Sequence, residues 1–234
     1  MKIDVVGSMC TWVKELSTSY IIDDKIMFDC PQGSFKNLLN DYDLKKINKI
    51  IISHFHSDHF ADIHLVLEVI FKKTKNNINI IAPKNCKEKI INMFKLFEVG
   101  YLQKDLEERV TFIDSENNKI IKLDGYKIKC FKMLHRDLDA YGFTIENGDK
   151  VIGFTGDSAM CNNVRKIIKK SQAIFIDSAN LAVDNKHLCV GEVNELSKEF
   201  QECTFYPIHL STYSLEEIKN TSLYHPKQGE VIEI

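Results

Sequence analysis

The residues whose types and spacing best suit chemistry lie at positions 53–59, where the sequence reads Ser-His-Phe-His-Ser-Asp-His. Three histidines and one aspartate fall within six residues, although the whole chain has only eight histidines. Neutral imidazole suits zinc, and carboxylate oxygen is its other usual partner. Four such ligands cannot easily serve one tetrahedral ion. If the loop is extended, His54 and His56 point one way, whereas Asp58 and His59 can be aimed at a neighbouring point. The spacing therefore favours two metal ions side by side.

The segments on either side of this motif predict how it is held. The run 49–52, Lys-Ile-Ile-Ile, is short and β-branched, and it predicts a buried strand that ends at the motif. Apolar residues recur at helical spacing over 61–73 and predict a helix. His64 falls within this helix, and we interpret it as a surface or hydrogen-bonded histidine rather than a ligand. The motif is thus expected on a loop that a rigid scaffold holds open to solvent.

Three more candidate ligands follow later in the chain, each at the end of a predicted strand. His135 ends the predicted strand 126–134, Asp157 follows 150–155, and His209 follows 204–208. Taken singly, each of them is more typical of a structural role. Taken with the 54–59 motif, they predict a cleft at which strand ends bring metal ligands together.

The order H-x-H-x-D-H, His135, Asp157, His209 resembles the metallo-β-lactamase superfamily. Within it the chain is most similar to the ribonuclease Z branch and its phosphodiesterase relatives, because of Phe28-Asp29-Cys30, Thr155-Gly156-Asp157-Ser158 and an extra His187. The resemblance implies a four-layer αββα sandwich, whereas the pattern of strands and helices alone indicates only an α/β fold. No linker or repeat interrupts the chain, so we expect one domain over 1–234.

The resemblance also implies roles for individual residues. Its ligands would be His54, His56 and His135 for a first metal, Asp58, His59 and His209 for a second, and Asp157 as the bridge between them. Zinc fits this nitrogen-rich set best, although manganese or iron also accept it. Asp58 would orient or deprotonate the attacking water, and His187 would protonate the leaving group. Asp29 either supports the metal loop through a histidine or merely opens a turn; the sequence leaves both readings open.

Two metals side by side can activate a water and polarise a phosphoryl or carbonyl oxygen, and the resemblance implies that the substrate is a phosphodiester. Our first hypothesis is a small nucleotide-type or cyclic-nucleotide substrate, because one hairpin over 140–155 joins His135 to Asp157 and leaves no room for a tRNA-gripping arm. Relatives without the arm include phage-encoded enzymes that cleave cyclic nucleotides. A tRNA 3′-end endonuclease of the ribonuclease Z type is the alternative. A thioester hydrolase, a di-iron redox protein or a binding module is a third, although redox relatives usually carry glutamate where His56 stands.

Composition and charge limit the class of protein, its substrate and its cellular location. Hydrophobic residues make up 44% of the chain and charged residues 27%, which is ordinary for a globular protein. The net charge of -2 provides no field to attract nucleic acid, so RNA is a weaker candidate than a small phosphodiester. Seven scattered cysteines without a C-x-x-C pair suggest reduced thiols. With no signal peptide and no membrane-spanning run, we expect a cytoplasmic protein; a homodimer is expected from the resemblance alone.

Overall fold

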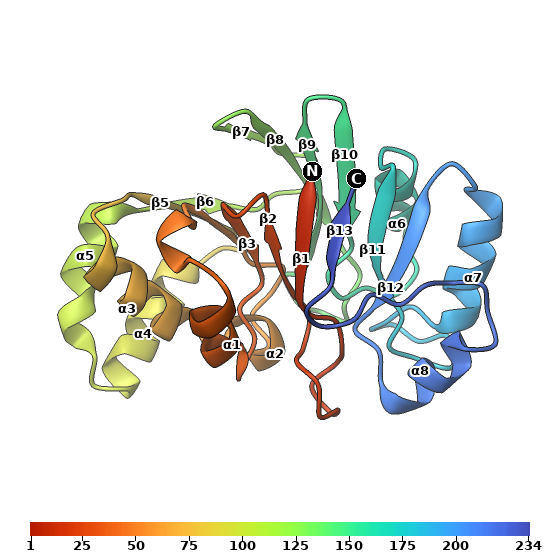
Figure 1. The fold of residues 1–234 in the computed structure, drawn as a ribbon, viewed down its shortest axis with the longest axis horizontal. Helices are drawn as coiled ribbons and strands as arrows, with labels where there is room; N and C mark the ends of the chain where they lie inside the picture. Colours follow the sequence, from red (N-terminus) through yellow and green to blue (C-terminus); the bar gives the residue numbers. More distant parts are fainter.

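The computed structural model describes residues 1–234, and its two β-sheets pack face to face (Figure 1). The first sheet has the strand order β13-β1-β2-β3-β4-β5-β6. Its strands are β1 (Lys2–Gly7), β2 (Ser19–Ile22), β3 (Ile26–Phe28), β4 (Lys49–Ile51), β5 (Ile78–Ala82), β6 (Val110–Asp114) and β13 (Val231–Glu233). The second sheet has the order β12-β11-β10-β9-β8-β7. Its strands are β7 (Ile120–Leu123), β8 (Tyr126–Lys132), β9 (Tyr141–Asn147), β10 (Lys150–Phe154), β11 (Ala173–Asp177) and β12 (Thr204–Ile208).

Helices cover the outer face of each sheet (Figure 1). On the first sheet they are α1 (Ser34–Asp41), α2 (Ser57–Phe60), α3 (Ile63–Lys73), α4 (Cys86–Leu96) and α5 (Gln103–Arg109), with 3-10 turns at Leu44–Lys46 and Gly100–Leu102. On the second they are α6 (Asn162–Ile168), α7 (Val190–Glu199) and α8 (Thr212–Ile218). This arrangement confirms the predicted αββα sandwich. No helix combines the length and the apolarity that a membrane crossing requires.

The strands that lead to the metal motif are buried on both faces. In β4, Ile50 packs into the cluster beneath the helices of the first sheet, and Ile51 packs into the cluster between the sheets. Burial on both faces explains why this strand reads as a continuous apolar run without alternation. Between the sheets, Phe154 stacks on Phe28 and on Phe175, with ring centroids 4.6 and 5.0 Å apart. The contact between Phe28 and Phe154 joins the end of β3 in one sheet to the end of β10 in the other, and Phe175 belongs to the same sheet as Phe154.

The predicted strand 204–208 matches β12 residue for residue, and the predicted strands 126–134 and 150–155 extend one or two residues beyond the ends of β8 and β10. The expectation of an extended metal loop is wrong in part, because residues 57–60 form the helical turn α2. Backbone hydrogen bonds hold this turn against the segment that follows β3: the Cys30 N–H donates to the His59 carbonyl at 2.8 Å. Long-range contacts of this kind leave no local sequence signal.

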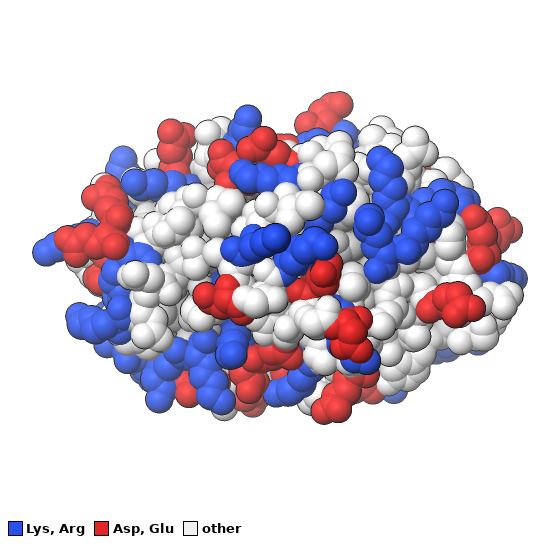
Figure 2. Space-filling model, turned by 90° about the horizontal axis from the view of Figure 1, so that it is seen from above, with Lys and Arg blue, Asp and Glu red and all other residues white.

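The far end of the sandwich, away from α2, is seen from above in Figure 2. Lys and Arg side chains and Asp and Glu side chains are both spread over this face. No single sign of charge dominates there, in keeping with the net charge of -2.

Candidate metal centre

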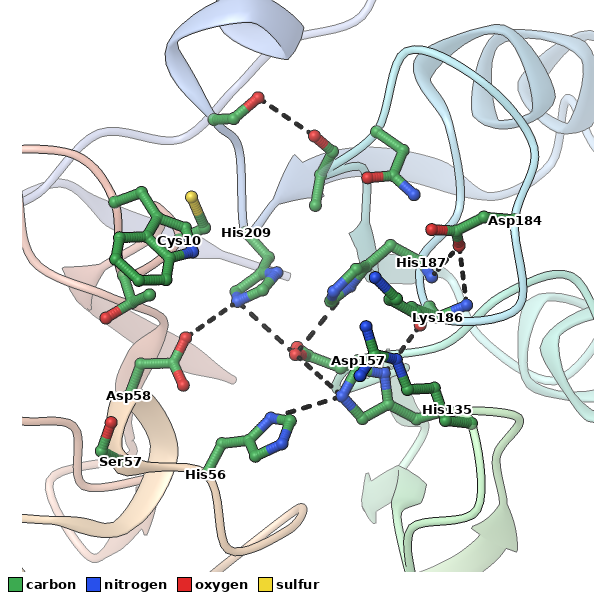
Figure 3. Close-up of a pocket in the computed structure, with 16 residues that line it drawn as sticks. Cys10, His56, Ser57, Asp58, His135, Asp157, Asp184, Lys186, His187 and His209 are labelled. Atoms are coloured by element: carbon green, nitrogen blue, oxygen red, sulfur yellow. Dashed lines mark hydrogen bonds and ion pairs between the residues drawn. The ribbon is translucent and has the colours of Figure 1, made fainter.

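The candidate ligands converge because the strands that deliver them end at one edge of the sandwich. Strands β8, β10, β11 and β12 run in the same direction, since β9 is antiparallel to both β8 and β10 and the others pair in parallel. In the first sheet β3 and β4 are also parallel. The residues just past these strand ends include the 54–59 motif, His135, Asp157 and His209. Figure 3 shows several of them pointing into a shared cavity.

The first cluster contains His54, His56, His135 and Asp157. The Nε2 atom of His54 and the Nδ1 atom of His56 lie 3.0 Å apart, and His56 Nδ1 lies 3.4 Å from Nε2 of His135. The His135 Nδ1–H donates to the Lys186 carbonyl at 2.8 Å, so its Nε2 offers a lone pair to the cluster. Tetrahedral zinc with Zn–N bonds of about 2.0–2.1 Å requires nitrogens about 3.3 Å apart, which these residues match.

The second cluster contains Asp58, His59 and His209. Asp58 Oδ2 lies 3.3 Å from His209 Nε2 and 3.8 Å from His59 Nε2. The His59 Nε2 atom is buried and has no hydrogen-bond partner. An orphaned buried nitrogen is costly, and a bound cation would satisfy it. These residues therefore fit a metal as well.

Asp157 contacts both clusters. Its Oδ2 lies 3.7 Å from His54 Nε2 and 3.5 Å from His209 Nε2, and its Oδ1 lies 3.3 Å from His59 Nε2. Burial would raise the pKa of this carboxyl, but the surrounding histidines, His209 foremost, hold the pKa well below its usual range. Asp157 is thus an ionised carboxylate between two nitrogen-rich groups, the position that the sequence analysis expected of a bridge.

Asp29 supports the motif from behind, and this contact favours the first of the two readings that the sequence left open. It is fully buried; its Oδ2 accepts from His59 Nδ1 at 2.7 Å, and its Oδ1 accepts from the Ser53 N–H at 2.7 Å. Holding the proton on Nδ1 directs the free Nε2 of His59 at the cluster. Burial lowers the pKa of His59, but the carboxylates of Asp157 and Asp29 outweigh it and raise that pKa to about 10, so a metal ion at Nε2 would have to displace a proton.

Sequence reasoning missed a second supporting carboxylate, Asp177, at the end of β11. Its Oδ2 accepts from His187 Nδ1 at 2.8 Å, and its Oδ1 lies 3.7 Å from Nδ1 of His209. The Ser158 N–H also donates to it, at 2.9 Å. A signal was present, because Asp177 ends an apolar strand just as Asp29 follows one.

His187 lies at the edge of the clusters. Its side chain is 17% exposed, and its ring stacks on the His209 ring with centroids 5.1 Å apart. Because Nδ1 donates to Asp177, Nε2 is left for another partner. Burial lowers the pKa of His187, but Asp177 and Asp157 more than compensate and raise it above its usual value. This histidine can carry a proton beside the clusters.

The clusters lie in a cavity of about 490 Å³. The expectation that the motif is open to solvent is wrong for most of its candidate ligands: His54, Asp58 and His59 are buried, and His56 alone among them is exposed. His64 lies outside the clusters, on α3, where its ring stacks on Phe97 with centroids 4.4 Å apart. The cavity lining also includes Trp12, Arg136 and Lys186, which can contact a substrate.

Comparison with known protein families gives a match over nearly the whole chain. The family described as anti-Pycsar protein Apyc1 matches residues 6–228. Among curated proteins, ribonuclease Z of Methanococcus maripaludis is 32% identical over 123 residues, which are 51% of this chain and 39% of that protein. The chain thus spans well under two thirds of the length of these ribonucleases.

Solved structures share the fold at low sequence identity. The metallo-β-lactamase fold protein YhfI from Bacillus subtilis has a TM-score of 0.79 at 19% identity and covers 100% of this chain and 99% of its own. The short form of human tRNase Z has a TM-score of 0.78 at 18% identity, covering 100% and 99%. A diphosphatase of the PhnP family reaches 0.76 at 16%, covering 100% and 97%. The fold is therefore that of the metallo-β-lactamases.

Proposed function

The chain belongs to the anti-Pycsar protein Apyc1 family, and on that premise we propose that it is a dinuclear-metal hydrolase that cleaves a small nucleotide-type or cyclic-nucleotide phosphodiester. One observation carries the proposal: Asp157 contacts two separate histidine-rich clusters at once. Two divalent ions held there would supply a nucleophile at neutral pH and neutralise charge on the phosphoryl group. Zinc suits the nitrogen-rich donor set best, with manganese or iron as alternatives.

The metal-binding and proton-transfer roles would fall to side chains of the protein itself. His54, His56 and His135 would hold one ion, Asp58, His59 and His209 the other, and Asp157 both. Asp58 lies at the cavity wall, 3.3 Å from His209, where it can orient a water and accept its proton. His187, held by Asp177, would donate a proton to the leaving oxygen.

The connection between His135 and Asp157 supports a small substrate. It consists of β9, β10 and a tight turn at Gly148, whose φ is +63°, with no arm that could grip tRNA. The cavity of about 490 Å³ lies in the range of small-ligand sites. Long nucleic acids need several Lys or Arg contacts, and the net charge of -2 does not favour them.

A second candidate is a tRNA 3′-end endonuclease, which the similarity to ribonuclease Z of Methanococcus maripaludis favours. A thioester hydrolase, a di-iron redox protein or a binding module has less support, because every proposed ligand position is filled and His56 stands where redox relatives carry glutamate. A single domain over 1–234, a homodimer and a cytoplasmic location stay predictions.

Turnover of three substrates, measured side by side, distinguishes these candidate functions. We expect purified, metal-loaded protein to cleave bis-p-nitrophenyl phosphate and at least one cyclic mononucleotide, and to process precursor tRNA poorly, because no arm anchors the tRNA. A ribonuclease Z assayed on the same three substrates is the control and should show the opposite ranking. Site-specific cleavage of precursor tRNA without activity on small diesters would make the endonuclease the correct assignment.

A further inference from the structure

Trp12, the only tryptophan of the chain, stands at the metal cavity with almost no protein around it. Its side chain is 90% exposed, the highest value among the large hydrophobic residues with exposed side chains, and it lines the cavity that holds the two clusters. Exposing so large an apolar surface forgoes the stabilisation that burial would give. An exposed indole beside a candidate active site suggests that a ligand binds against it from solution.

Backbone hydrogen bonds fix the segment that carries Trp12 beside the candidate metal ligand His209. In the connection between β1 and β2, the Cys10 N–H donates to the Leu210 carbonyl at 3.0 Å, and the His209 N–H donates to the Ser8 carbonyl at 2.6 Å. A side-chain bond from Gln32 to the Thr11 hydroxyl, at 2.7 Å, adds a tie to the segment after β3. Trp12 therefore lies two residues from Cys10, whose backbone is hydrogen-bonded to Leu210, the residue that follows the candidate ligand His209.

The remaining lining is polar. Of the sixteen residues around the cavity only Cys10, Trp12 and Ala179 are hydrophobic, so the indole is the only extended apolar surface available. Arg136 and Lys186 have no carboxylate partner within 4.0 Å and suit the negative charge of a phosphate. A substrate with one charged part and one flat aromatic part would match the two kinds of surface.

We propose that the Trp12 indole is the stacking platform for the nucleobase of the substrate and gives the site its preference for diesters that carry a base. The inference rests on the proposed function, because it needs a phosphodiester at the metal clusters. Every base has a π face, so stacking selects for the presence of a base without reading its identity.

Paired substrates test the role of Trp12. Base stacking on an aromatic side chain is worth about 1–3 kcal/mol, so Trp12→Ala should lower kcat/KM for a cyclic mononucleotide by about 5- to 150-fold. Trp12→Phe should recover most of the loss. A cyclic ribose phosphate with a methoxy group in place of the base should be cleaved equally by all three proteins. Tyr213→Ala is the matched control, because Tyr213 is a 74% exposed aromatic residue that does not line the cavity.

Fluorescence gives a second readout that does not depend on turnover. Because Trp12 is the single indole of the chain, its fluorescence should be quenched saturably by a nucleoside monophosphate and not by orthophosphate. If no diester is cleaved but the quenching occurs, the proposed reaction fails while the base platform stands. Equal losses on substrates with and without a base, or a change of oligomeric state in Trp12→Ala, would instead make the indole a structural contact or an interface with a second copy, and would overturn the inference.

Discussion

Asp157→Ala is expected to abolish phosphodiester hydrolysis and to weaken both metal sites together. The carboxylate lies 3.3–3.7 Å from ring nitrogens of His54, His59 and His209, so its loss removes one ligand and one negative charge from each cluster. Removing an outer-shell partner typically costs about 10–100-fold in metal affinity or activity, and a shared ligand should cost more. Metal content per chain and kcat on bis-p-nitrophenyl phosphate measure the two effects.

Asp137→Ala is a suitable control for this variant. Asp137 is exposed and lies two residues from His135, but it belongs to neither cluster and does not line the cavity. Its replacement should leave metal content and turnover unchanged. If Asp157→Ala kept two metal ions per chain with near-normal turnover, Asp157 could not be the bridge.

His187→Ala is expected to keep its metals and lose rate by an amount that depends on the leaving group. General acid catalysis is typically worth about 10²–10⁴-fold. A ribose alkoxide leaves poorly without a proton, so a cyclic nucleotide should show the full loss. A p-nitrophenolate leaves readily without one, so bis-p-nitrophenyl phosphate should be affected far less. The measurement is kcat for both substrates at matched metal content.

His64→Ala serves as the control for His187→Ala, because His64 lies on α3 against Phe97 and outside the clusters. Equal losses on the two substrates would argue against a proton donor and would leave His187 a role in binding phosphate. A drop in bound metal would make it a ligand or a structural residue instead. The second outcome has a physical basis, since His187 shares Asp177 with His209.

The parts of the fold that the sequence predicted well are those whose signal is local. Strand β12 matches its predicted range of 204–208, and β8 and β10 start where the predicted strands 126–134 and 150–155 start. Helix α5 escaped prediction because Leu106 is its only buried residue, and β13 because one buried residue in three gives no pattern. The helical turn α2 depends on contacts with the segment after β3, which no window around 57–60 contains.

The candidate site likewise has some features that the local sequence predicts and others that it does not. The structure places the seven residues that the motif and its later partners suggested as ligands within two adjoining clusters, and their role as ligands stays a prediction. Asp177 was missed although it ends an apolar strand, because its importance lies in a contact with His187, ten residues further along the chain. The buried state of His54 and His59 was also beyond local reasoning, since it follows from how the two sheets pack.

The proposed phosphodiester hydrolysis depends most directly on two metal ions acting in one site. Metal-free protein should be titrated with Zn²⁺, and separately with Mn²⁺, while hydrolysis of bis-p-nitrophenyl phosphate is followed. Two equivalents of zinc per chain should be bound, and activity should rise until the second site is filled, because Asp157 couples the clusters. Full activity at one equivalent, or two bound ions without any phosphodiester hydrolysis, would contradict the central claim.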